Sequence, residues 1–141
     1  MKIGLGGMGE GWAVDKVYDL LKPAKFKSGY IDASGAVRVW GVKPNGKLWV
    51  IAVGDPRPMN PDPARKEFIY KMYATDLAVT TAGDTEKSFY KNGRLYHHII
   101  DPKTGYSADQ SIQVTCIGKT ATLCDFVDDG AFILGDSKGM T

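Results

Sequence analysis

The stretch from Tyr96 to Tyr106 constrains this chain more than any other, because it joins two adjacent histidines to a stiff turn. His97 and His98 are followed by two isoleucines and then by Asp-Pro-Lys-Thr-Gly. Pro102 fixes its own φ angle and Gly105 can adopt a positive φ, so the sequence predicts a strand that ends in a tight turn. An imidazole is therefore held at the rim of a sheet, where it can serve a site or make a buried structural hydrogen bond.

A glycine-rich segment at the beginning of the sequence has two interpretations. Gly4, Gly6 and Gly9 form the pattern GxGxxG, and Asp32 follows at about the distance seen in dinucleotide-binding Rossmann units. We disfavour that interpretation, because too few residues precede Gly4 to form the required strand and the later elements are predicted as hairpins. Backbone N–H groups of such a loop can bind phosphate at a helix N-terminus, although a tight packing turn is the alternative.

Two helices are predicted from apolar residues at helical spacing. The first spans residues 11–22, and Pro23 prevents its continuation. The second spans residues 122–134. We expect this second helix to bury one apolar stripe, which consists of Leu123, Phe126, Val127, Ala131 and Leu134.

Strands account for most of the remaining sequence. Alternating or β-rich runs are found at residues 36–40, 47–53, 67–73, 77–81, 94–100 and 111–117. The turn at Asn45 and Gly46 predicts that the first two of these strands form a hairpin, and the prolines from Asp55 to Pro63 predict a surface loop. Antiparallel hairpins packed with two main helices define an α+β domain.

The composition excludes several classes of protein. Hydrophobic residues make up 43% and charged residues 24%, which is ordinary for a globular domain. A net charge of +2 is too small to predict binding to nucleic acid or to a membrane surface. The sequence has neither a run of ~20 apolar residues, which a membrane span needs, nor a signal peptide. Cys116 and Cys124 lack CxxC spacing, so we expect free thiols, with a disulfide as the alternative.

The run from His98 to Gly105 resembles the His-Ile-Ile-Asp-Pro-x-Thr-Gly signature of the ApbE family, the FAD:protein FMN transferases. Further blocks resemble the family in the same order and cover nearly the whole chain: residues 4–15, 29–35, 49–57, 80–84 and 122–135. The resemblance implies an ApbE-like domain, similar to the T-fold, over residues 1–141. It also implies that this single domain lacks the N-terminal portion and the extreme C-terminus of the family.

The activity implied by the resemblance is a Mg²⁺-dependent transfer of FMN from FAD to a Thr hydroxyl of a target protein, with release of AMP. The target would carry a flavinylation motif. One alternative is a Mg²⁺-dependent FAD pyrophosphatase, in which water replaces the Thr. Another is a degenerate flavin-binding or structural remnant, which is favoured by Gly4 where the family usually has Asp. Family members are often exported, so the resemblance implies a periplasmic or membrane-anchored protein; a chain complete as given would be cytoplasmic.

The resemblance implies that the backbone carbonyl of Gly7 and the carboxylates of Asp125, Asp128 and Asp129 bind Mg²⁺. Asp129 stands where the family often has Thr. The spacing i, i+3, i+4 places the three carboxylates on one helix face, where they repel one another unless a cation or solvent separates them. The alternative is a solvated acidic face in which Asp125 caps its own helix, three residues after Thr122.

Contacts with the flavin are implied for Gly7, Glu10, Thr81 and Ile100. A structural alternative exists for each side chain among them. Glu10 lies near a helix start, where the dipole favours an acid; Thr81 can be a structural hydroxyl at a strand end; and Ile100 can fill the core.

His98 is the catalytic residue implied by the resemblance, since it lies next to the isoleucine pair. It would position or deprotonate the attacking Thr hydroxyl. Adjacent side chains on a strand point to opposite faces, so we expect His98 to face the site and His97 to face away from it.

Overall fold

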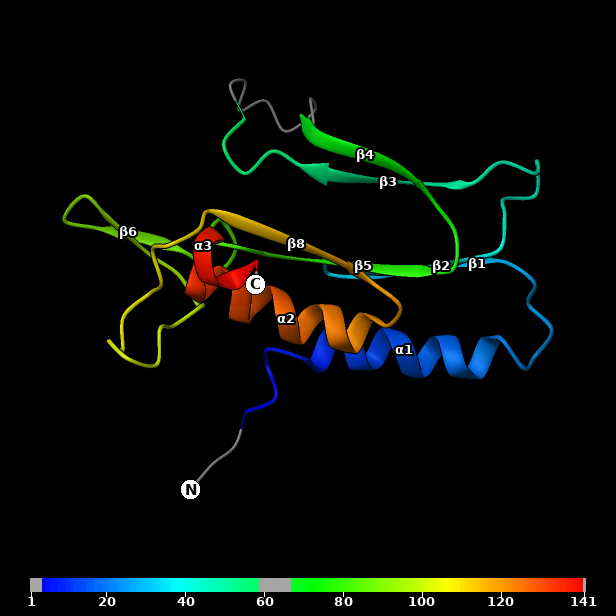
Figure 1. The fold of residues 1–141 in the computed structure, drawn as a ribbon, viewed down its shortest axis with the longest axis horizontal. Helices are drawn as coiled ribbons and strands as arrows, with labels where there is room; N and C mark the ends of the chain where they lie inside the picture. Colours follow the sequence, from blue (N-terminus) through cyan, green and yellow to red (C-terminus); the bar gives the residue numbers. More distant parts are fainter. Residues whose placement is uncertain (1–3, 59–66, 141) are drawn as a thin grey trace.

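A four-stranded antiparallel sheet forms the centre of the fold in the computed structural model, which describes residues 4–58 and 67–140 (Figure 1). The strands follow the order β1-β2-β5-β8: β1 (Gly29–Ala33), β2 (Ala36–Trp40), β5 (Leu77–Gly83) and β8 (Gln113–Gly118). The central strands are the most buried, with Val39 and Ala78 fully inaccessible to solvent. The predicted α+β class is confirmed.

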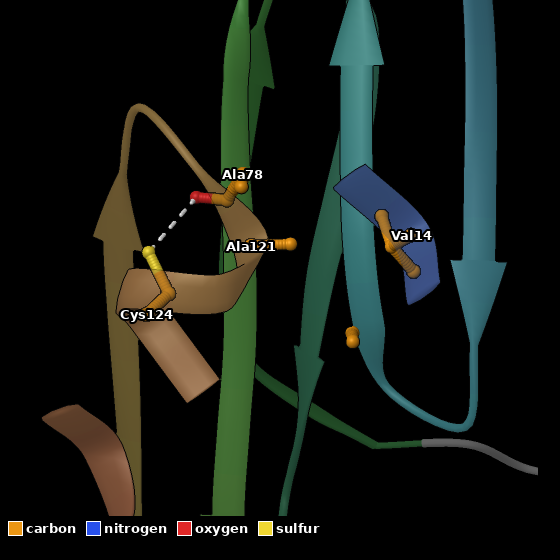
Figure 2. Close-up of a cluster of buried hydrophobic side chains, with 5 residues drawn as sticks. Val14, Ala78, Ala121 and Cys124 are labelled. Atoms are coloured by element: carbon orange, nitrogen blue, oxygen red, sulfur yellow. Dashed lines mark hydrogen bonds between the residues drawn. The ribbon is translucent and has the colours of Figure 1, made fainter. Parts of the chain in front are cut away.

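Two long helices pack side by side on one face of this sheet: α1 (Gly9–Leu21) and α2 (Ala121–Leu134) (Figure 1). A short helix, α3 (Asp136–Gly139), follows. Small apolar side chains fill the space between helices and sheet: Val14, Ala36, Ala78, Ala121 and Cys124 (Figure 2). Their small volume lets the helices approach the sheet closely. Both cysteines are free thiols.

A separate ribbon covers part of the other face of the sheet: β3 (Trp49–Gly54) and β4 (Phe68–Ala74) (Figure 1). The predicted hairpin of residues 36–40 with residues 47–53 is therefore wrong. Both edges of β2 are already paired, with β1 and β5, so β3 pairs with β4 in another layer. The indole N–H of Trp49 donates to the Trp40 carbonyl at 3.1 Å and connects the ribbon to the sheet.

A small hairpin precedes the histidines: β6 (Phe89–Lys91) and β7 (Arg94–Tyr96). The predicted strand over residues 94–100 is wrong beyond Tyr96, because the next backbone N–H, that of His97, donates to the side chain of Ser107. Ile100 makes only an isolated bridge with Ser107. The predicted turn is present, and Gly105 closes it with a φ of 73°.

The apolar stripe predicted to be buried on α2 is exposed instead. Leu123, Phe126 and Leu134 retain 58%, 64% and 46% of their accessible surface. The face that packs on the sheet is the opposite one: Ala121, Cys124, Asp128 and Phe132. Because α2 is apolar on both sides, periodicity alone could not select the buried face.

Two further expectations concern the surface. The loop predicted from Asp55 to Pro63 falls partly on residues 59–66, which lie outside the described residues. Among the helices of residues 4–58 and 67–140, none has the length and apolar character to cross a bilayer.

Candidate functional site

A cavity of about 310 Å³ lies between the glycine-rich loop, α2, the end of β5 and the segment that follows β7. Every residue assigned to the site from the sequence lines it: Gly7, Glu10, Thr81, His98, Ile100, Asp125, Asp128 and Asp129. These residues come from four distant segments of the chain, so the fold itself brings them together. Their individual roles remain predictions.

Asp128 lies at the bottom of the cavity with 2% of its surface exposed. Burial is the main cause that raises the pKa of Asp128 to about 7; the charges of Asp129 and Asp125 add to the effect, and the Thr80 hydroxyl opposes it. Burial and the neighbouring charge of Asp125 also raise the pKa of Asp129, which His98 in turn lowers. The cavity therefore concentrates negative charge that a cation would stabilise.

Asp125 is held by a contact with the first helix. Its Oδ2 accepts a hydrogen bond of 2.8 Å from the backbone N–H of Gly11, in the first turn of α1. The alternative in which Asp125 caps its own helix is wrong, because the N-cap of α2 is Thr120, whose hydroxyl accepts from the N–H of Leu123. Asp125 thus connects the two helix N-termini at the cavity wall.

Gly7 lies directly against Asp129 in the cavity wall. A Cβ atom placed on Gly7 would lie 2.7 Å from Oδ2 of Asp129, so a side chain there would force the carboxylate to move. The absence of a side chain leaves space beside a carboxylate and brings backbone atoms close to it.

The oxygen donors that line the cavity fit a hard divalent cation, but the three carboxylates do not converge on one point. Within residues 4–58 and 67–140, no three His, Cys, Asp or Glu side chains converge as a metal-binding group. The fit rests on three oxygen donors in one cavity, on the bare Gly7 and on the raised pKa of Asp128. The buried Thr80 hydroxyl is close enough to Asp128 to influence its pKa, but it makes no hydrogen bond of good geometry within residues 4–58 and 67–140, so it can still take part in a polar site.

The structure separates the two histidines. His97 is buried, its Nε2–H donates to the Ala108 carbonyl at 2.8 Å, and its ring packs edge-on against Phe132. His98 is exposed at the cavity, and its Nδ1–H donates to the Glu86 carbonyl at 3.2 Å. A carbonyl can only accept, so this contact places the proton of neutral His98 on Nδ1 and leaves Nε2 as a proton acceptor.

The side chains proposed to contact the flavin occupy different parts of the rim. Glu10 is exposed at the start of α1, and Ile100 retains 46% of its surface. The hydroxyls of Thr81 and Thr115 share a hydrogen bond of 2.9 Å across β5 and β8. Thr81 is therefore supported structurally while it remains at the cavity wall.

Sequence reasoning missed two features of the site. Lys87 and Ser34 also line the cavity, each with a positive φ (44° and 52°). Ser34 lies in the family-like block 29–35 but was given no role, and no motif marks Lys87. Asp15 fixes the start of α2: its carboxylate accepts from the backbone N–H groups of Ala121 and Thr122 and from the Thr122 hydroxyl. Its position on the buried side of α1 was the signal available in the sequence.

Several known proteins are similar to this chain in sequence and in fold. An FAD:protein FMN transferase of Vibrio cholerae is 30% identical over 139 residues, which cover 98% of this chain and 40% of that protein. The solved ApbE protein of Thermotoga maritima is 36% identical with a TM-score of 0.84, over 94% of this chain and 41% of that one. The apo flavinyl transferase ApbE of Pseudomonas stutzeri is 28% identical with a TM-score of 0.77, over 98% and 41%.

This chain thus spans about 40% of the length of the curated relatives it matches. The likeness extends over nearly all of the chain and includes both its sequence and its fold. The model of the family described as "ApbE family" matches residues 1–141. The chain belongs to the ApbE family.

Proposed function

We propose that this chain contributes the cation-binding and catalytic part of a flavin transferase that moves FMN from FAD to a Thr hydroxyl of a target protein. The observation that carries the proposal is one cavity that holds three carboxylates, the bare Gly7 and a histidine whose Nδ1–H donates to a carbonyl, which makes Nε2 the proton acceptor. The names of the relatives, FAD:protein FMN transferase, support the same reaction.

The cation proposed for this cavity is Mg²⁺, held by Asp125, Asp128 and Asp129 together with the backbone carbonyl of Gly7. A Mg²⁺ ion held there would supply positive charge to offset the negative charge of a bound pyrophosphate. The carboxylates are positioned by the protein: Asp125 by the Gly11 N–H and Asp128 by its burial on α2.

His98 acts in this proposal as the general base. The target hydroxyl oxygen forms a bond to the phosphorus of the FMN portion, the bond to the AMP phosphate breaks, and the hydroxyl proton passes to Nε2 of His98. AMP leaves with the electron pair of the broken bond. The Glu86 carbonyl keeps the other ring nitrogen protonated, which orients Nε2 as the acceptor.

Incubation with FAD, Mg²⁺ and a polypeptide that carries a flavinylation-motif Thr tests the proposal. We expect covalently bound FMN, detected by mass spectrometry, together with an equal amount of AMP. The reaction is run with this chain alone and with this chain grafted into the Thermotoga maritima ApbE protein in place of the matched region. AMP and free FMN without a modified target would identify a pyrophosphatase instead, and no product in either form would refute the proposal.

A further inference from the structure

Lys87 is a cation in the wall of the acidic cavity, and the reaction described above gives it no role. It belongs to the loop of residues 84–88, which connects β5 to β6, and it lines the cavity together with the carboxylates of α2. Lys87 forms no ion pair within residues 4–58 and 67–140, where Asp15 and Asp84 are paired with arginines. Its ammonium group can therefore bind an anion that enters the cavity.

The loop that carries Lys87 is held in place by its own polar contacts. At its start, Asp84 is 7% exposed, and its carboxylate accepts a hydrogen bond of 2.6 Å from Arg57. At its end, the hydroxyl of Ser88 donates to the Thr85 carbonyl at 3.0 Å and closes the loop into a turn. A charged group on a loop fixed in this way is oriented before a ligand binds.

The same loop contacts the histidine of the site. The carbonyl of Glu86, the residue before Lys87, accepts the Nδ1–H of His98 at 3.2 Å. Lys87 itself has a φ of 44°, which is uncommon for a residue with a long side chain. Strained backbone of this kind is concentrated at functional sites. The loop thus places a lysine next to the residue that orients His98.

The charges of the cavity explain what a lysine can do there. Glu10, Asp125, Asp128 and Asp129 all line it, so a phosphate group meets repulsion unless positive charge offsets these carboxylates. A divalent cation held by the carboxylates offsets part of their charge. Lys87 supplies a further positive charge from a different segment of the wall, and lysine binds phosphate well as a point charge.

We propose that Lys87 binds a phosphate oxygen of the FAD pyrophosphate and stabilises the charge that develops as the pyrophosphate bond breaks. This assignment rests on the proposed function and names a further residue for it. The hydroxyl proton passes to His98 and AMP leaves with the electron pair, so the phosphates together gain one negative charge. A fixed ammonium group therefore binds the transition state more strongly than the bound substrate.

Calorimetric titration of the whole chain with inorganic pyrophosphate, in the presence of Mg²⁺, tests the assignment without catalysis. We expect the wild type to bind pyrophosphate and Lys87→Ala to bind it about tenfold more weakly. Lys87→Arg keeps the charge and should retain most of the affinity. Lys87→Gly relieves the positive φ but lacks the charge, so it should lose as much affinity as Lys87→Ala.

Transfer kinetics provide the second measurement, in the graft into the Thermotoga maritima ApbE protein described above. Lys87→Ala should lower kcat about tenfold or more and leave the KM for the target polypeptide unchanged, because the lysine contacts phosphate only. Lys91→Ala is the matched control for both measurements. Lys91 is an exposed lysine on β6 that does not line the cavity, so its loss should change neither pyrophosphate affinity nor kcat.

Four results would overturn the role of Lys87: a wild type that binds no pyrophosphate as chain or graft, equal affinity in wild type and Lys87→Ala, a Lys87→Gly variant that binds like the wild type, or an equal loss in Lys91→Ala. Failure of the proposed function gives a different result. Pyrophosphate binding that depends on Lys87, without FMN transfer in either form, would support the phosphate site and refute the transferase reaction.

Discussion

Asp128 combines features that a purely structural residue would avoid. Its carboxylate is buried on α2 beside Asp125 and Asp129, although burial and like charges both oppose its ionisation. A leucine or asparagine at this position would avoid the free-energy cost of burying an ionisable group. Carboxylates kept in such surroundings are characteristic of sites in which the charge is needed for a ligand.

Replacement of Asp128 by Asn should remove the pH dependence of stability that this residue causes. The folded pKa of about 7 lies above the ordinary value of 3.8, so between these pH values the folded state holds a proton that the unfolded state has lost. Stability therefore falls as pH rises through this window. Without metal, we expect Asp128→Asn to melt roughly 2–4 °C above the wild type at about pH 8. At about pH 4, the two proteins should have the same melting temperature.

Mg²⁺ provides the second half of that test. The cation should raise the melting temperature of the wild type at about pH 8 and leave Asp128→Asn unchanged, because the ligand is lost. Asp136→Asn, an exposed substitution just beyond α2, is the control for the general effect of removing a charge. An identical response to Mg²⁺ in wild type and Asp128→Asn would contradict a cation site at this residue.

The two histidines should separate catalysis from folding. His98→Ala removes an exposed side chain, so we expect near-normal stability and loss of FMN transfer. His97→Ala removes a buried ring and leaves the Ala108 carbonyl without its donor, so it should cost about 2–4 kcal/mol while folded protein retains activity. Urea unfolding and the transfer assay measure the two effects. Equal loss of activity in both variants would show that the role assigned to His98 is wrong.

At the level of elements, the start of α2 is fixed by residues outside that helix. Burial would raise the pKa of Asp15, but hydrogen bonds from Thr122 and Ala121 and the charge of Arg38 hold it below its usual value. Arg38 also stacks on the Tyr18 ring, 3.6 Å from its centroid. Asp15 therefore joins α1, α2 and β2 at one point, and it sets the position from which α2 carries its carboxylates.

Two glycines in the first turn of α1 should respond oppositely to alanine. A Cβ on Gly11 would lie 2.3 Å from the Ala121 carbonyl oxygen and 2.7 Å from Cβ of Asp125, so Gly11→Ala must push the helices apart. We expect a loss of about 1–3 kcal/mol and weaker Mg²⁺ binding by calorimetry. Gly9→Ala meets no atom within 4 Å and should be neutral or stabilising by up to about 1 kcal/mol. Equal effects of the two variants would show that close helix packing at Gly11 is unimportant.

Local signals in the sequence identified most elements but not their partners. The strand over residues 36–40 was predicted with the bounds that β2 has, yet its pairing with residues 47–53 was wrong, since pairing depends on strands far along the chain. The cavity residues could be assigned because a family pattern records their joint position. The roles of Asp15 and Lys87 were not predicted. The position of Asp15 on α1 indicated that it is buried, but its contacts with α2 exist only in the folded chain.

At the scale of the whole molecule, three layers depend on one sheet: the helices on one face, the sheet itself and the β3–β4 ribbon on the other face (Figure 1). The ribbon is joined to the sheet through a second apolar cluster: Val37, Val39, Ile51, Ala74 and Val79. Two-stranded ribbons are marginal alone in water, so this cluster must supply the stability of β3 and β4. The layers are therefore expected to fold as a single cooperative unit.

Ile51→Ala tests whether the ribbon and the sheet unfold together. Ile51 is 6% exposed between the two layers, and its truncation should cost about 2–4 kcal/mol. Its neighbour Val50 is 43% exposed on the outer side of the ribbon, so Val50→Ala should cost less than about 1 kcal/mol. Helix content is followed by far-ultraviolet circular dichroism, and the tryptophan fluorescence reports on Trp49 and Trp40. Within each variant, the two probes should give the same unfolding midpoint. A fluorescence transition that precedes the loss of helix in Ile51→Ala would show that the ribbon detaches first and that the molecule folds in two units.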